Sequence, residues 1–121
     1  MIGIGVDLVD VDRMRTVLSR TPSLVARLFT TGEQAYALAA VDPTERFAVR
    51  FAAKEAVMKA LGVGLGAIDW HDVEVVKADS GAPSLRVTGR AAVLADGAGI
   101  TTWKLTLAHT ATVAEAIAVA L

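Results

Sequence analysis

The sequence predicts a single α+β domain in which an antiparallel sheet packs against one long helix. Apolar residues recur at helical spacing through most of residues 10–61, whereas from residue 71 onward they mainly alternate with polar ones. Helices gathered early and strands gathered late are typical of α+β folds. At 121 residues the chain is expected to form one domain, residues 1–121, that buries about two thirds of its unfolded surface.

The first half is expected to begin with a strand and continue in helices. Residues 2–9 alternate as a strand. Its faces carry Ile4, Val6 and Leu8 on one side and Gly3, Gly5, Asp7 and Val9 on the other. Short helices are expected over residues 10–20 and 23–29, and the capping-box spacing of Thr30 and Glu33 opens another that runs to about residue 40.

The long helix is expected to start at the signal Asp42-Pro43-Thr44-Glu45 and to end at Leu61. Gly62 follows it and can adopt the left-handed conformation of a helix C-cap. Strands are then expected over residues 71–78, 85–88 and 102–108, with a short helix at 89–97. The alanine-rich tail, residues 113–121, has helix propensity, but its pairing prospects with the preceding strand favour β structure.

Composition excludes several classes of protein. The net charge of −1 gives no sign of nucleic-acid binding, and the absence of cysteine excludes disulfides and thiolate metal sites. No apolar run is long enough to span a membrane, and residues 1–6 lack the basic leader of a signal peptide, so we expect a cytoplasmic protein. A hydrophobic fraction of 54% is high for a small monomer and hints at surface buried between subunits.

The long helix carries an unusual arrangement of charge. Arg46, Arg50 and Lys54 follow one another at spacings of four residues, so like charges stack along one stripe. An external anion along this stripe would remove the repulsion. Glu55 lies among these cations, four residues before Lys59, and is explained either as an ion pair with that lysine or as a ligand for a metal ion.

Asp7 is a second candidate, because a carboxylate inside an apolar strand is costly to bury unless it is paired or bound to a metal. The alternative is that Asp7 caps the helix that follows. Two carboxylates on separate elements, together with substrate phosphates, are how proteins usually hold Mg²⁺.

A cluster of arginines without acidic neighbours occupies residues 13–27. It comprises Arg13, Arg15, Arg20 and Arg27. Such a surface either steers an acidic partner toward the molecule or is simply a solvated helix face, and the pattern alone does not favour one over the other.

These motifs resemble those of a known family, the small 4′-phosphopantetheinyl transferases of the holo-[acyl-carrier-protein] synthase type. The resemblance rests mainly on residues 3–8 (GIGVDL) and on residues 50–56 (RFAAKEA) followed by 59–62 (KALG). Weaker matches lie at Phe29-Thr30 with Glu33, at residues 81–89 (GAPSLRVTG) and at residues 106–110 (TLAHT). They occur in the family's order and cover nearly the whole chain.

The resemblance implies a Mg²⁺-dependent transfer of phosphopantetheine from coenzyme A to a serine of an acyl carrier protein. It implies a homotrimer with sites between subunits, Asp7 and Glu55 as Mg²⁺ ligands, and Lys59 on the pyrophosphate. Arg50, Lys54 and His109 would line the coenzyme A site, and Arg13, Arg15 and Arg20 would dock the carrier. Glu55, through a metal-bound water, is the first candidate for the base and His109 the second, although Ala108 removes a possible hydrogen-bond partner beside that histidine.

Two other functions remain open from the sequence. One is a related transferase that serves polyketide or peptide-synthase carriers; its larger family members are about twice this length, which favours the short trimeric type. The other is a non-catalytic nucleotide-binding or scaffold domain, which would not need Asp7 and Glu55 together.

Overall fold

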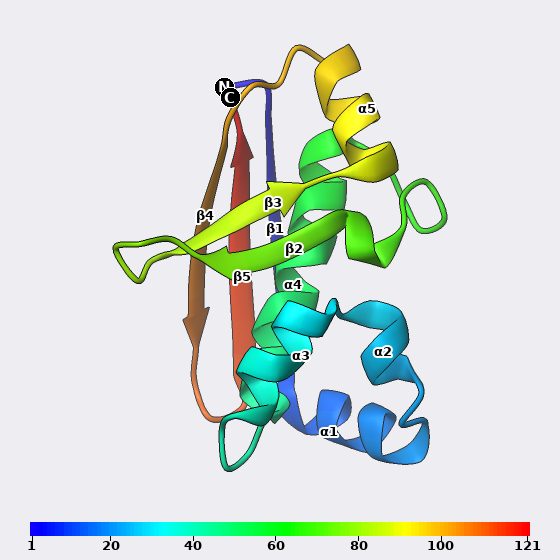
Figure 1. The fold of residues 1–121 in the computed structure, drawn as a ribbon, viewed down its shortest axis with the longest axis vertical. Helices are drawn as coiled ribbons and strands as arrows, with labels where there is room; N and C mark the ends of the chain where they lie inside the picture. The colour runs from blue at the N-terminus through cyan, green and yellow to red at the C-terminus, as the bar shows by residue number, and fades with distance from the viewer.

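The fold is built around one helix, α4 (Thr44–Leu61), that lies along a three-stranded antiparallel sheet (Figure 1). The computed structural model describes residues 1–121. The sheet has the order β1-β5-β4, with β1 at Gly3–Asp10, β5 at Val113–Ala120 and β4 at Trp103–His109. The first and last strands of the chain are therefore neighbours, and both termini lie at the same end of the sheet.

Smaller elements surround α4. A hairpin of β2 (Val73–Lys77) and β3 (Pro83–Val87) crosses it beside β4, and α5 (Gly89–Gly97) lies near the termini (Figure 1). The helices α1 (Val11–Arg20), α2 (Leu24–Leu28) and α3 (Thr31–Leu38) gather at the other end. None of the helices combines the length and the apolar character needed to cross a bilayer.

The predicted fold class is confirmed, and most elements lie where the sequence places them. The tail forms β5, the central strand of the sheet, as its pairing prospects indicated. The strand expected over 71–78 starts only at Val73, because residues 70–72 form a 3₁₀ turn in which Asp69 accepts a hydrogen bond from the His71 amide. The strand expected from residue 85 already starts at Pro83.

The contact between β1 and α4 is unusually close. Gly3 and Gly5 turn toward the helix, and a Cβ atom on either would collide with the backbone carbonyl of Ala60 or Ala56. Glycine at alternate positions thus lets a strand backbone lie directly against a helix backbone. The partner that approaches these two glycines is the backbone of α4.

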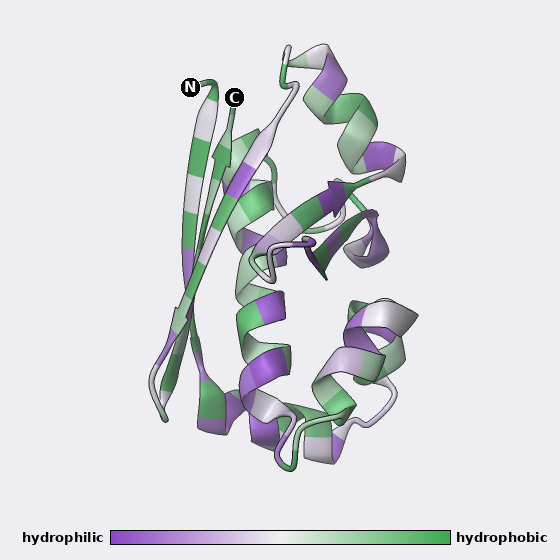
Figure 2. Cartoon of the chain, turned by 60° about the vertical axis from the view of Figure 1, so that its left-hand side comes forward, coloured by the Kyte–Doolittle hydropathy of each residue, from purple (hydrophilic) through white to green (hydrophobic).

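The outer face of the sheet is apolar and uncovered. Ile4, Val6 and Leu8 point away from α4 and are 55%, 49% and 64% exposed. In the register of the sheet, Ile117 lies beside Val6 and Val119 beside Ile4, which extends the apolar surface onto β5. Figure 2 shows this sheet at one side of the molecule, with no helix outside it. Contiguous apolar surface of this kind marks an interaction site.

Replacing Gly5 by Ala is expected to lower the free energy of unfolding by about 3 kcal/mol, because the new methyl group must push β1 away from α4. Gly64→Ala is the matched control, since nothing lies within 4 Å of its Cβ position, and it should change stability by less than about 0.5 kcal/mol. Urea denaturation at one fixed protein concentration measures both. Equal stability of the two variants would contradict the close packing of β1 on α4.

Candidate functional site

Two carboxylates meet where β1 lies on α4. Asp7 comes from the strand and Glu55 from the helix. Burial raises the pKa of Glu55, the nearby negative charge of Asp7 raises it further, and the positive charge of Lys59 opposes both. Lys59 Nζ donates to Asp7 Oδ1 at 3.0 Å and to the carbonyl of Val6 at 2.9 Å. The geometry therefore concentrates two acidic groups and one ammonium group at one point.

The sequence also allowed Asp7 to cap a helix and Glu55 to pair with Lys59, and the structure shows neither contact. The cap of α1 is Asp10, which accepts a hydrogen bond from the Arg13 amide at 2.9 Å, so Asp7 does not cap that helix. Lys59 forms its ion pair with Asp7 and not with Glu55. No third acidic residue or histidine completes a metal cage here. A two-carboxylate set of this kind fits Mg²⁺, which keeps several waters and takes its other ligands from substrate phosphates.

A cavity of about 630 Å³, here called the carboxylate pocket, opens beside Asp7 and Glu55. A third carboxylate, that of Asp10, also lines it, but its other walls are mostly apolar. They include Met14, Val17, Leu24, Leu28, Phe51 and Trp70, with Arg13 as the cation. Phe51 and Trp70 stack with ring centroids 5.2 Å apart, which gives the pocket a rigid aromatic wall.

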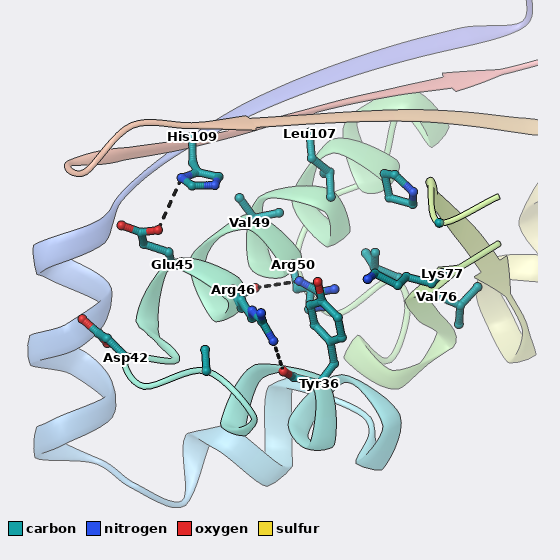
Figure 3. A pocket seen from close by; sticks show the side chains of 14 residues that line it. Tyr36, Asp42, Glu45, Arg46, Val49, Arg50, Val76, Lys77, Leu107 and His109 are labelled. Atoms are coloured by element: carbon teal, nitrogen blue, oxygen red, sulfur yellow. Dashed lines mark hydrogen bonds and ion pairs between the residues drawn. The ribbon is translucent and has the colours of Figure 1, made fainter. Parts of the chain in front are cut away.

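A second cavity of about 550 Å³, here called the cation pocket, lies between α4, α3 and the β2–β3 hairpin (Figure 3). Arg46, Arg50 and Lys77 reach into it around Tyr36, while Glu45 and His109 lie at another side of it. His109 Nδ1 is 3.4 Å from Glu45 Oε2. The pocket offers an excess of positive charge next to a histidine–carboxylate pair, which suits a phosphorylated ligand.

The two pockets have no lining residue in common. Asp7 lies on β1 and His109 on β4, which are the two outer strands of the sheet, and α4 contributes Glu55 to one pocket and Arg50 to the other. The structure thus brings Asp7, Glu55 and Lys59 together and places Arg50 and His109 elsewhere on the same chain.

Lys54 belongs to neither pocket, which corrects the expectation that it lines the coenzyme A site. Its side chain is 1% exposed and its Nζ lies 2.7 Å from Glu33 Oε1. The ammonium also donates to the carbonyls of Trp70 and Val73. Burial lowers the pKa of Lys54, and Glu33 opposes this shift. The stripe of charge splits here because Lys54 turns into the core while Arg46 and Arg50 face the cation pocket.

The arginines of α1 differ in their freedom to bind a partner. Arg13 lines the carboxylate pocket, and Arg20 is exposed and makes no ion pair. Arg15 is engaged by Asp12 and Asp42. The amide of Thr44 and the guanidinium of Arg15 lower the pKa of Asp42 to about 2, so Arg15 contributes little net charge to the surface.

Sequence reasoning missed several residues that line the pockets, above all Tyr36, Lys77 and Glu45. The sequence offers one signal for Tyr36, which is that it is the only tyrosine of the chain. Lys77 ends a strand far along the chain, and only the tertiary fold brings it to the same ring.

Known proteins are similar to this chain over nearly its whole length. The family model described as the 4′-phosphopantetheinyl transferase superfamily matches residues 3–119. The holo-[acyl-carrier-protein] synthase of Frankia alni is 50% identical over 120 residues, which cover 99% of this chain and 97% of that protein. The same comparison gives 46% identity for the holo-[acyl-carrier-protein] synthase of Streptomyces avermitilis, with 99% and 97% coverage.

Solved structures share the whole fold. The holo-[acyl-carrier-protein] synthase of Neisseria meningitidis has a TM-score of 0.90 at 27% identity and covers 100% of this chain and 98% of its own. The Helicobacter pylori holo-[acyl-carrier-protein] synthase in complex with coenzyme A has a TM-score of 0.85 at 27% identity, covering 98% and 99% of the two chains.

The Lys54→Met variant is expected to lose about 3–5 kcal/mol of stability in urea denaturation, because it leaves the buried Glu33 without its partner charge. The Glu33→Gln variant should also be destabilised. The double variant should lose less than the sum of the two, since no uncompensated charge remains. Strictly additive losses would show that the ion pair is not what the core depends on.

Proposed function

The chain belongs to the 4′-phosphopantetheinyl transferase superfamily, and we propose that it converts an apo-acyl carrier protein to the holo form. Membership confirms the resemblance seen in the sequence motifs and the prediction that the chain is an enzyme, a phosphopantetheinyl transferase. In the proposed reaction a carrier serine accepts the 4′-phosphopantetheine arm of coenzyme A, and adenosine 3′,5′-bisphosphate leaves. The proposed setting is cytoplasmic fatty acid biosynthesis.

The observation that carries the proposal is the meeting of Asp7, Glu55 and Lys59 at one point of the surface. We assign Asp7 and Glu55 to Mg²⁺, which would offset the negative charge of the pyrophosphate when bound. Lys59 would stabilise charge on the leaving bisphosphate. The serine hydroxyl must lose a proton, and Glu55 is our candidate acceptor because Asp7 already holds the Lys59 ammonium.

The cation pocket is the proposed site for the nucleotide end of coenzyme A, with Arg50 and His109 among its walls. In one chain this pocket and the carboxylate pair lie toward opposite edges of the sheet and share no lining residue. We propose that a second copy supplies the missing half, in the homotrimer expected from the sequence. The uncovered apolar face carrying Ile4, Val6 and Leu8 is suited to this contact.

The carrier protein is proposed to dock over α1. Arg13 and Arg20 present free positive charge there, and the apolar walls of the carboxylate pocket can take nonpolar side chains of the partner. Arg15 is a weaker member of the predicted docking set, because two aspartates already engage it.

Incubation of the protein with coenzyme A, Mg²⁺ and an apo-acyl carrier protein should add one phosphopantetheine mass to the carrier, as measured by mass spectrometry. Asp7→Ala and Glu55→Ala should each lower the rate by at least about a hundredfold, since each removes a proposed ligand of the metal. Asp96→Ala is the matched control, because Asp96 is exposed on α5 and forms no ion pair. Absence of any mass gain with several carriers would refute the proposed activity.

Mixing two impaired variants tests whether each site is shared between copies. At a coenzyme A concentration far below the KM, Asp7→Ala and Arg50→Ala would each be strongly impaired alone, but mixed oligomers should regain about a quarter of full activity, because some interfaces combine two intact halves. Light scattering on the same samples should give a trimer mass. A mixture that stays impaired while forming mixed trimers would place the complete site within one chain.

A further inference from the structure

Three cations of the cation pocket converge on one aromatic ring (Figure 3). The guanidinium carbon of Arg46 lies 4.2 Å from the centroid of the Tyr36 ring and that of Arg50 lies 4.3 Å from it. Lys77 Nζ lies 5.0 Å from the same centroid. The three residues come from α4 and from the end of β2, so a single side chain of α3 gathers cations from two other elements.

None of these cations has a carboxylate partner. The ion pairs of the chain involve other basic residues, and the two acids of the pocket are engaged elsewhere, Asp42 by Arg15 and Glu45 by His109. Arg46 and Arg50 donate only to backbone carbonyls, those of Tyr36 and Arg46. The charge of the cluster is thus held in place without being cancelled.

Arg50 gives an independent sign that the cation pocket suits an anion. Arg50 is only 7% exposed, and its Nε atom has no hydrogen-bond partner. Burial lowers the pKa of Arg50, which reflects the cost of holding this charge away from water. A buried donor without an acceptor is unfavourable, and an anion in the pocket would offset that cost.

The pKa of Tyr36 also indicates an excess of positive charge in the pocket. Burial alone would raise the pKa of its phenol, but the charges of Arg46, Lys77 and Arg50 together lower it. The potential at the ring is therefore positive. An aromatic face attracts cations through its quadrupole and leaves their charge available, which an aspartate in the same place would not do.

We infer that Tyr36 is a positioning residue that holds Arg46, Arg50 and Lys77 ready for a phosphate monoester of the ligand. The inference rests on the proposed function, in which coenzyme A carries two groups of negative charge. The diphosphate goes to the carboxylate pair and its metal, so the cation cluster is left for the 3′-phosphate. Tyr36 thereby sets the preference for coenzyme A over its 3′-dephosphorylated form.

Steady-state kinetics with coenzyme A and with dephospho-coenzyme A tests this inference. Tyr36→Leu should raise the KM for coenzyme A about tenfold, with kcat within about twofold, and leave the KM for dephospho-coenzyme A unchanged. Tyr36→Phe keeps the ring and should behave as the parent. Lys77→Met, at an exposed position, should raise the KM for coenzyme A alone, by about fivefold. Leu38→Ala, on the exposed side of α3, is the control.

Equal loss with both substrates, or failure of Tyr36→Phe to restore the parent value, would overturn the role of Tyr36. Calorimetric titration with adenosine 3′,5′-bisphosphate and with adenosine 5′-monophosphate gives a readout that needs no turnover. The parent should prefer the bisphosphate and Tyr36→Leu should lose that preference. A parent that binds the bisphosphate in this way but transfers nothing would refute the proposed function and leave the role of Tyr36 standing.

Discussion

The direct contact of the β1 backbone with the α4 backbone is the constraint on which the rest of the structure depends. It exists because Gly3 and Gly5 carry no side chain where Ala60 and Ala56 approach. Only at this separation does a carboxylate on the strand share one surface point with a carboxylate on the helix. The chemistry proposed for Asp7 and Glu55 therefore depends on the absence of side chains at Gly5 and Gly3, two and four residues before Asp7.

Much of the fold could be predicted because its signals are local. Capping residues, apolar periodicity and the glycine after α4 mark the ends of most elements, and the capping box of Thr30 and Glu33 forms as expected. The tail was the hardest element, since alanine favours helices. Its strand state is decided by pairing with β1 and β4 on both sides, which no local propensity contains.

The carboxylates of the candidate site could be predicted from the sequence, but its cations could be predicted only in part. Arg46, Arg50 and Lys54 lie on one stripe because they are four residues apart. The stripe winds around the helix axis, so that over eight residues its direction changes enough for Lys54 to enter the core. There Glu33 and two backbone carbonyls satisfy the ammonium. Tyr36 and Lys77 escaped notice because they lie in separate elements, and only packing brings them together.

The pairing of β1 with β5 has a consequence for how the molecule is made. β5 is the only strand neighbour of β1, so the sheet joins the first residues of the chain to the last. Closing so long a loop is entropically expensive, and contacts this distant in sequence slow folding. A growing polypeptide can form its helices early, but β1 and the glycine face that receives α4 acquire their neighbouring strand only when synthesis of residues 113–120 is complete.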